Sequence, residues 1–350
     1  MPPWETLCGG NQTMTTEFIL LGFGTGREAQ IPLLFLFLVI YIMTISGNIL
    51  IVVLVVFDQH LHTPMYYFLG NLSCLETFYS SAILPRVLYS LLTGDRSISF
   101  IGCFAQNYFF GMLVTTECFL LAAMSIDRYL AICKPLHYAT VMNNKLCSQL
   151  AAGSWMGGWL AITITTSFMS QLIYCGANEM DHFFCDFAPL VNLSCSNTRT
   201  VTVLSFILSS VCAFPPFFLT LATYVCIITS ILQIPSASGR QKAFSTCSSH
   251  LLVVIIFYGT LIVVYVLPNS STLRDLNKVF SLLYTILTPL ANPLIYSLRN
   301  KEVKGALKKG LHKWVFLYWS LVLNFDPITT TATTTTTTTA TTNTTKDNPS

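Results

Sequence analysis

The chain has 350 residues, of which 53% are hydrophobic and only 9% are charged. A soluble domain usually carries about 25% charged residues, and no soluble fold of this length can bury so much apolar surface. The composition therefore excludes a soluble globular protein, and the small net charge of +3 gives no indication of nucleic-acid binding.

Residues 1–30 are expected to form an extracellular N-terminal segment. They contain no continuous apolar core, so we expect no cleavable signal peptide and assign the insertion signal to the first helix. Asn11 begins a glycosylation sequon, Asn11-Gln12-Thr13, in this segment.

Residues 31–300 are predicted to form a seven-transmembrane helix bundle, which makes the chain an all-α membrane protein. A helix needs about 20 mostly apolar residues to cross the hydrocarbon core. The stretches that meet this length lie at about 31–57, 64–92, 100–133, 146–169, 200–234, 243–267 and 277–298.

The distribution of positive charge predicts the orientation of the bundle. With the N-terminus outside, the loops and ends on the inner side carry almost twice as many lysines and arginines as those on the outer side. An excess of these residues marks the cytoplasmic side, so we predict an outer N-terminus and an inner C-terminus in a multi-pass plasma-membrane protein.

Cysteines on the outer side agree with this orientation. Cys103 lies at the outer start of the third span, and Cys175, Cys185 and Cys195 lie in the second outer loop. Four cysteines that face an oxidising compartment indicate two disulfides, and three pairings are open to them.

The segment after the last span divides into two parts. Residues 301–325 are expected to be a juxtamembrane segment, in which 301–313 form a short basic amphipathic helix on the inner leaflet and 314–325 are too few to span. Residues 326–350 are mostly threonine and are expected to be a disordered cytoplasmic tail.

Two motifs end predicted spans. Asp127-Arg128-Tyr129 lies 25 residues after Cys103, roughly 37 Å along a helix, so Arg128 is placed at the inner water boundary. The alternative is a simple interfacial arginine that extends into water. Asn292 to Tyr296, in which Pro293 frees a backbone carbonyl, forms a flexible point in the seventh span or, alternatively, a simple kink.

Several segments together resemble vertebrate olfactory receptors of the rhodopsin-like (class A) G-protein-coupled class. The resemblance runs from about residue 16 to 309. Glu76, Ile126 and Ala291 depart from the usual residues of the family. The matching segments are Gly47-Asn48, LHTPMYYFLGNLSCLE at 61–76, MSIDRYLAICKPLHY at 124–138, HFFCD at 182–186, GRQKAFSTCSSH at 239–250 and NPLIYSLRN at 292–300.

The resemblance implies a receptor without enzyme activity that couples to an olfactory-type stimulatory G protein and raises cyclic AMP. It implies disulfides from Cys103 to Cys185 and from Cys175 to Cys195. The residues implied in G-protein coupling and switching are Asp127, Arg128, Tyr129, Tyr224, Lys242, Ser245, Asn292, Pro293 and Tyr296.

In such a fold the ligand cavity is expected between the outer halves of helices 3, 5, 6 and 7. The expected lining is apolar and aromatic, with hydroxyls but without charges, so we predict a small, neutral, volatile odorant. The alternative is that Arg199 or Lys278 at the rim captures an acid. The lining residues are Phe110, Gly111, Val114, Thr115, Phe187, Phe206, Leu208, Tyr258, Leu261, Ile262, Tyr265, Leu282 and Thr285.

Glu76 and Glu117 are placed near mid-membrane, where charged residues are costly and indicate function. We expect that they form a sodium site with Asn292, or that both acids are protonated; no other cofactor is expected. A metal site at His182, Cys185 and Asp186 is less favoured because Cys185 is the best disulfide candidate. A transporter or channel, and a receptor for an internal ligand, remain the rival functions.

Overall fold

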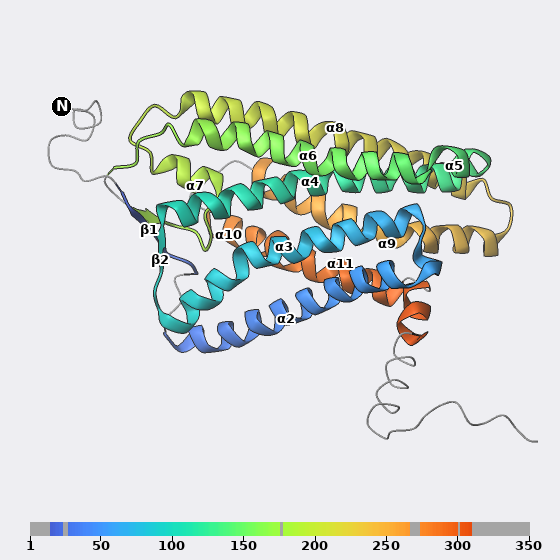
Figure 1. Cartoon of the computed structure of the whole chain (residues 1–350), viewed down its shortest axis with the longest axis horizontal. Coiled ribbons are helices and arrows are strands. Elements are labelled where there is room, and N and C mark those ends of the chain that lie inside the picture. The colour runs from blue at the N-terminus through green and yellow to red at the C-terminus, as the bar shows by residue number, and fades with distance from the viewer. Residues whose placement is uncertain (1–14, 24–26, 176–177, 267–273, 300–301, 310–350) are drawn as a thin grey trace, which may run out of the picture. The chain divides into compact units, whose positions relative to one another are not determined.

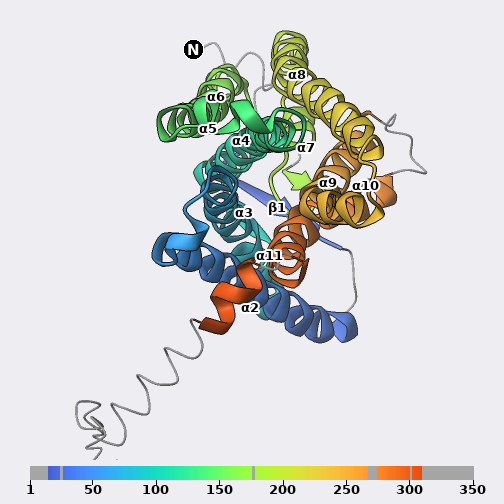
Figure 2. The same ribbon diagram turned by 90° about the vertical axis from the view of Figure 1, so that its right-hand side faces the viewer.

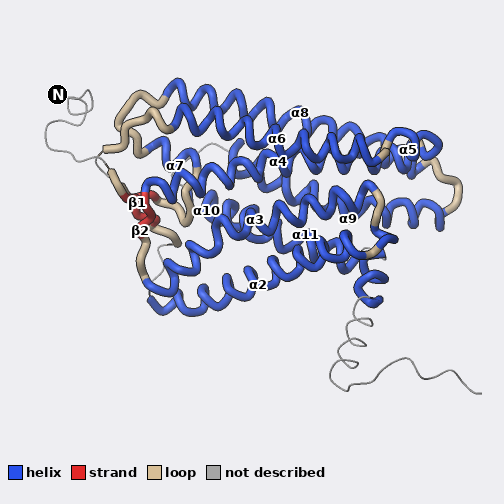
Figure 3. The backbone as a smooth tube through the Cα atoms, in the orientation of Figure 1, coloured by secondary structure: helices blue, strands red, loops and turns tan. Residues whose placement is uncertain are grey.

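The computed structural model describes residues 15–23, 27–175, 178–266, 274–299 and 302–309. The chain divides into two compact units, Met1–Ala306 and Leu307–Ser350, and only 307–309 of the second unit are among the described residues. Helices dominate the first unit (Figure 1 and Figure 3). Asn11, the segment 314–325 and the threonine-rich tail lie outside the described residues.

Long helices form the body of the first unit, and each of the seven predicted stretches is helical. The seventh stretch is built from α10 and α11, joined by a π-helical segment, η3. The elements are α2 (Arg27–Phe57), η1 (Gln59–Leu61), α3 (Pro64–Thr93), α4 (Phe100–Cys133), α5 (Pro135–Val141), α6 (Asn144–Met169), α7 (Phe187–Asn192), α8 (Arg199–Leu232), α9 (Ala237–Val266), α10 (Arg274–Leu282), η3 (Leu283–Leu287) and α11 (Thr288–Arg299).

The lengths and apolar faces of these helices fit a membrane. Among the described residues, four helices are long and apolar enough to cross one, and a fifth is added if the two halves of α9 form one bent span. Large apolar side chains point outward from the bundle, such as Ile31 and Phe35 on α2 and Phe218 on α8. Outward apolar side chains are costly in water but favourable in lipid, which explains the unusual composition.

Local sequence signals set several helix ends. The Ser99 hydroxyl accepts a hydrogen bond from the Gly102 amide at the start of α4, and the Asn143 side chain accepts one from the Leu146 amide at the start of α6. Such caps satisfy backbone donors that have no partner within the helix. Gly94 ends α3 with a φ of +77°, a left-handed conformation that favours glycine.

A small sheet on the outer side departs from the predicted all-α architecture. The central strand β1 (Glu17–Leu20) pairs antiparallel with β2 (Ser97–Ser99) and parallel with β3 (Glu179–Met180). Phe18 and Leu20 turn to the same side of β1 and are buried. The N-terminal segment is therefore tied to both the first and the second outer loop.

Helix α4 is the centre of the bundle. It contacts α3, α6, α8 and α9, and Figure 2 shows it surrounded by neighbouring helices. Its packing against α6 is close at Gly158: a Cβ atom there would collide with the Thr116 hydroxyl and would lie 2.6 Å from the Met112 carbonyl oxygen. Glycine is thus required at this crossing of α4 and α6.

A further helix covers residues 302–309, within the predicted amphipathic segment. Val303 and Ala306 are buried, whereas Lys304 is exposed. The Tyr66 hydroxyl of α3 donates a hydrogen bond of 2.7 Å to the Glu302 carboxylate, which fixes the start of this helix against the inner end of α3.

Candidate functional site

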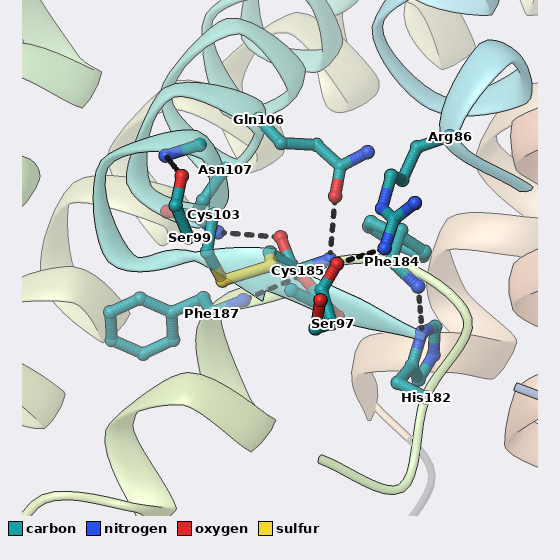
Figure 4. Close-up of a disulfide and its surroundings, with 12 residues drawn as sticks. Arg86, Ser97, Ser99, Cys103, Gln106, Asn107, His182, Phe184, Cys185 and Phe187 are labelled. Carbon is teal, nitrogen blue, oxygen red and sulfur yellow. Dashed lines mark hydrogen bonds between the residues drawn. A yellow bond between two sulfur atoms is a disulfide. The ribbon is translucent and has the colours of Figure 1, made fainter. Parts of the chain in front are cut away.

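The second outer loop forms a lid that two disulfides hold in place. Cys103 at the start of α4 is bonded to Cys185, with 5.4 Å between their Cα atoms, and Cys175 is bonded to Cys195, with 5.9 Å. These are the two predicted pairings. Figure 4 shows how the first disulfide joins the lid to the outer end of α4.

Two buried polar side chains of α4 hold the same point of the lid. The Gln106 side-chain oxygen accepts a hydrogen bond of 2.9 Å from the Cys185 amide, and the Asn107 side chain donates one of 3.3 Å to the Cys185 carbonyl (Figure 4). Both residues were missed in the sequence. Their signal was a pair of amides one helical turn after Cys103, on the side that faces the lid.

Phe110 of α4 lies at the centre of an aromatic cluster beneath this lid. Its ring centroid is 4.8 Å from Phe184 of the lid, 5.3 Å from Tyr79 of α3 and 5.8 Å from Tyr284 of η3. Phe110, one of the residues predicted to line the ligand cavity, is thus in direct contact with the lid. Phe184, rather than the predicted Phe187, provides that contact.

Other predicted cavity residues also face the interior of the bundle. Tyr258 of α9 is buried, its hydroxyl donates to the Cys118 carbonyl at 3.3 Å, and its ring packs on Phe217 of α8. Thr285 of η3 is fully buried and donates to the Ser281 carbonyl at 2.6 Å. Half-buried side chains among the predicted set are Val114, Thr115, Leu208, Leu261 and Leu282.

Several predicted cavity residues are not brought to this cluster. Phe206 exposes 71% and Ile262 exposes 43% of its surface on the outside of the bundle, because each lies on the outward side of its helix. Gly111 faces Ile162 of α6, and Phe187 packs in a separate outer core that contains Cys103. The side chain of Tyr265 lies outside the described residues.

The inner end of α4 carries an ion pair with a third partner. The Arg128 guanidinium donates to one Asp127 carboxylate oxygen at 2.9 and 2.5 Å, and the Tyr138 hydroxyl of α5 donates to the other at 2.8 Å. Asp127 is fully buried. Tyr138 was missed in the sequence, although it lies in the segment 124–138 that carries the motif.

A second polar contact lies nearby, between α8 and α9. The Tyr224 hydroxyl and the His250 Nδ1 atom are 2.6 Å apart, and both residues are buried. Among the remaining predicted switch residues, Asn292, Pro293 and Tyr296 are buried in α11, Tyr129 is half-buried, and Lys242 and Ser245 are exposed at the inner end of α9.

The two carboxyl groups at mid-bundle are both buried, on α3 and α4. The Asn292 side chain donates to one Glu76 oxygen, and Glu117 lies near enough to Glu76 for their charges to interact. One oxygen of Glu76, one of Glu117 and the side-chain oxygen of Asn48 have no hydrogen-bond partner among the described residues. Asn48 donates instead to the Thr44 and Pro289 carbonyls at 3.1 Å.

Comparisons with known proteins agree with this arrangement. The olfactory receptor family model matches residues 37–313. The chain is 49% identical to human olfactory receptor 6F1 over 87% of the chain and 98% of that protein. It is 46% identical to human olfactory receptor 6N1 over 87% of the chain and 97% of that protein. It is 47% identical to mouse olfactory receptor 6Z7 over 88% of the chain and 99% of that protein.

The chain belongs to the olfactory receptor family. It is therefore an odorant-sensing G-protein-coupled receptor of the plasma membrane with several membrane-crossing helices, and it is not an enzyme. Family membership removes the transporter or channel alternative and the receptor for an internal ligand. Among the described residues, no three histidine, cysteine or acidic side chains gather as metal ligands.

Two ionisable residues in the lid of the receptor are buried, and burial moves their pKa values in opposite directions. Burial lowers the pKa of His182 to about 4, and the nearby Lys278 ammonium adds to this. Burial raises the pKa of Asp186 to about 6, against the opposing effect of the hydrogen bond from the Phe187 amide. Their contributions to stability therefore have opposite signs below neutral pH.

We expect that the free energy of unfolding of the His182→Gln receptor rises as pH falls from about 6 to about 4, because only the effect of Asp186 then remains. The folded receptor takes up the Asp186 proton more readily than the unfolded chain, so this group favours folding at the acidic end of the window. His182 acts in the opposite sense, because only the unfolded chain protonates it readily. Each effect amounts to about 3 kcal/mol over its window.

Thermal unfolding between pH 4 and 7 checks this expectation about the pKa values of His182 and Asp186. Asp186→Asn keeps the side-chain oxygen that accepts from the Phe187 amide and serves as the matched variant. It is expected to lose stability faster than the wild type as pH falls. Parallel stability curves for all three proteins would contradict the assignment.

Proposed function

We propose that the receptor spans the membrane seven times with its N-terminus outside and activates an olfactory-type stimulatory G protein, which raises cyclic AMP. The Asp127–Arg128 pair at the inner end of α4 is the observation that carries this proposal. A G protein that contacts Arg128 competes with Asp127 for it, so coupling and the state of the ion pair are linked. Lys242 and Ser245 complete the proposed contact surface, and the buried Tyr224 lies nearby.

The experiment that tests this function is a cyclic-AMP assay in cells that express the chain with the stimulatory G protein. Mixed volatile compounds are screened first, and active mixtures are then separated. A response that requires both the receptor and this G protein supports the proposal. A response that persists with an inhibitory G protein alone would contradict the coupling, while leaving the odorant-sensing function intact.

The ligand that fits the outer bundle is a small, neutral and largely apolar odorant. Phe110, Phe184 and Tyr258 offer aromatic surface, and Thr115 and Thr285 offer hydroxyl groups for orientation. Small-ligand sites combine apolar walls with a few polar groups in this way. At the rim, Lys278 is paired with Asp181 at 2.5 Å, which neutralises one of the two cations that could capture an acid.

We predict that alcohols and ketones are more potent agonists than acids and amines of the same carbon skeleton. A charged ligand would leave water without a counter-ion in the aromatic cluster, and this desolvation is costly. Dose–response curves for the four compound classes measure the difference. Potent activation by an acid that is lost in Arg199→Ala or Lys278→Ala would instead establish capture at the rim.

The buried carboxyl pair is proposed to hold a sodium ion with Asn292 in the inactive receptor. Oxygen atoms of Glu76 and Glu117 that have no partner among the described residues could serve as ligands. Hard cations such as Na⁺ prefer oxygen ligands, and an unpaired buried carboxylate is otherwise costly. The alternative is that both carboxyl groups are protonated and need no cation.

We expect that sodium raises the thermal stability of the purified receptor relative to the same concentration of potassium. Glu117→Gln removes one charge at nearly constant shape and is expected to abolish this difference. The measurement is the unfolding temperature in detergent, in titrations of each salt at constant ionic strength. An equal response to sodium and potassium, with Glu117→Gln identical to the wild type, would favour the protonated pair.

A further inference from the structure

A hollow on the outer side of the first unit lies apart from the aromatic cluster around Phe110. It is bounded by β1 and the residues that follow it, by the outer ends of α2 and α3, and by Phe183 of the lid. The hollow is shallow and open to solvent, with a cavity volume of about 40 Å³. Its walls combine apolar side chains with two arginines, Arg86 and Arg96, and include no acidic residue.

The two arginines differ in the interactions that their guanidinium groups make. The Arg86 guanidinium donates to the Ser97 carbonyl (Figure 4) and to the Asp95 carbonyl at 3.4 Å, and it lies 5.1 Å from the centre of the Tyr89 ring. Its role is therefore partly structural. The backbone of Arg96 is fixed by a hydrogen bond of 2.9 Å from the Leu20 amide to its carbonyl.

The backbone of Arg96 is thus fixed at the hollow, and its guanidinium charge is not neutralised by an ion pair. Among the described residues its guanidinium has no ion-pair partner, because the two ion pairs there are Arg128–Asp127 and Lys278–Asp181. A half-buried cation beside apolar walls favours an anion with an apolar part. An arginine can hold a carboxylate or phosphate through two parallel hydrogen bonds.

Apolar side chains line the hollow and also lie exposed beside it. Leu21, Phe23 and Leu91 line the hollow. Leu92 and Ile31, which follow directly on lining residues of α3 and α2, expose 71% and 64% of their surfaces to the outside. An aliphatic chain can therefore leave the hollow between the outer ends of α2 and α3 and enter the outer leaflet.

We propose that this hollow binds an amphiphilic anion, with the acid group on Arg96 and the aliphatic chain on Leu21, Phe23 and Leu91. Two sources share this chemistry, a free long-chain carboxylate and an anionic phospholipid of the outer leaflet. A small hydrophilic anion would leave the apolar walls unused, and a neutral apolar compound would leave the arginine unpaired. The site is distinct from the odorant site beneath the lid.

Contacts between aromatic rings connect the two sites. The ring centroid of Phe23 is 5.1 Å from that of Phe183, Phe183 is 5.0 Å from Phe184, and Phe184 is 4.8 Å from Phe110. Because Phe183 is both a wall of the hollow and part of the lid, an occupant that packs on it stabilises the lid. The bound anion is expected to raise the unfolding temperature without acting as an agonist.

The test uses the full-length receptor in phosphatidylcholine nanodiscs at neutral pH, with a photoreactive dodecanoate as probe. Cross-linked peptides are mapped, and the label is expected within residues 20–23, 86–91 or 96. Unlabelled dodecanoate should compete, whereas acetate and dodecanol should compete at least about tenfold less well, equivalent to about 1.4 kcal/mol. Nanodiscs that contain phosphatidylserine form the second arm: reduced labelling there assigns the site to the phospholipid.

Variants locate the charge that holds the probe. Arg96→Gln is expected to weaken labelling about tenfold, whereas Arg96→Lys keeps most of it. Arg240→Gln removes the same charge from an exposed arginine near the start of α9 and should leave labelling unchanged. If Arg96→Gln fails to fold, Ser90→Phe, which fills the hollow and keeps both arginines, is expected to reduce labelling instead.

Three results would overturn the proposal. One is equal labelling by a photoreactive dodecanol, which would show that the arginine plays no part. Another is a loss of labelling in Arg240→Gln but not in Arg96→Gln. The third is labelling that maps outside the hollow in every variant, which would indicate partition of the probe into the lipid.

Discussion

Arg128→Ala is expected to reduce odorant-driven cyclic AMP to the background of cells without the receptor. In the structure the guanidinium is held by Asp127 at 2.5 and 2.9 Å, and Tyr138 holds the second oxygen of the same carboxylate. A ligand shifts a receptor toward its active state only if it binds the two states differently, and we propose that this pair passes the shift to the G protein. The cyclic-AMP assay measures the loss.

Surface delivery has to be measured in the same cells, because the change leaves the Asp127 carboxylate buried without its cation. Arg128→Gln keeps hydrogen-bond donors and provides a second variant if the alanine form is retained inside the cell. Lys145→Ala removes an exposed cation of α6 and is the matched control. Normal signalling from well-delivered Arg128 variants would disprove the assigned role.

Tyr138→Phe tests the contribution of Tyr138 separately from that of Arg128, the other partner of Asp127. This change keeps the ion pair but removes the hydrogen bond that joins α5 to it. Higher basal cyclic AMP than in the wild type, with an unchanged maximal response, would indicate that Tyr138 stabilises the inactive pair. The Arg128 variants are expected instead to lose the odorant-driven cyclic-AMP response. A general folding defect would not raise basal cyclic AMP in Tyr138→Phe and can therefore be distinguished.

Gly158→Ala is expected to destabilise the receptor by about 1–3 kcal/mol, although alanine is normally the better helix former. The added methyl group would collide with the Thr116 hydroxyl and would lie 2.6 Å from the Met112 carbonyl oxygen, which is backbone and cannot rotate away. Helices α4 and α6 would have to separate. A lower unfolding temperature of the purified receptor measures the effect.

Gly153 on the same helix is the matched control, since a Cβ atom there meets nothing within 4 Å. Gly153→Ala is expected to be neutral or slightly stabilising. Gly111→Ala is expected to fall between the two, because the methyl group would meet the far end of the flexible Ile162 side chain at 2.5 Å. Equal unfolding temperatures for all three variants would show that α4 and α6 move apart at little cost.

The helices and the polar motifs could be predicted because each is encoded locally, whereas the two disulfide pairings followed only from the resemblance to a known family. A run of apolar residues has the length of the membrane, Pro64 and Gly94 mark the ends of α3, and the motif at Asp127 is continuous in the sequence. The outer sheet could not be predicted in this way. Its strands have two to four residues and are specified by partners in distant loops.

The expected lining of the ligand cavity was the least predictable part of the candidate site. Positions carried over by spacing fail when a helix is rotated by one residue, because one residue turns a side chain by about 100° around an α-helix. Phe206 shows the consequence: it points outward, whereas its neighbour Ser205 is buried. The lid was also ambiguous, since Phe184 and Phe187 flank Cys185 on different sides (Figure 4) and only Phe184 contacts Phe110.

The order in which the ribosome makes the chain gives β1 an unusual place in biogenesis. Glu17–Leu20 is translated before its partners Ser97–Ser99 and Glu179–Met180, which emerge only after further helices have been made. The strand therefore lacks its complete set of partners until the lid has been translated. An unpaired strand edge can pair with other chains, so late completion of the sheet leaves β1 open to wrong pairing during synthesis.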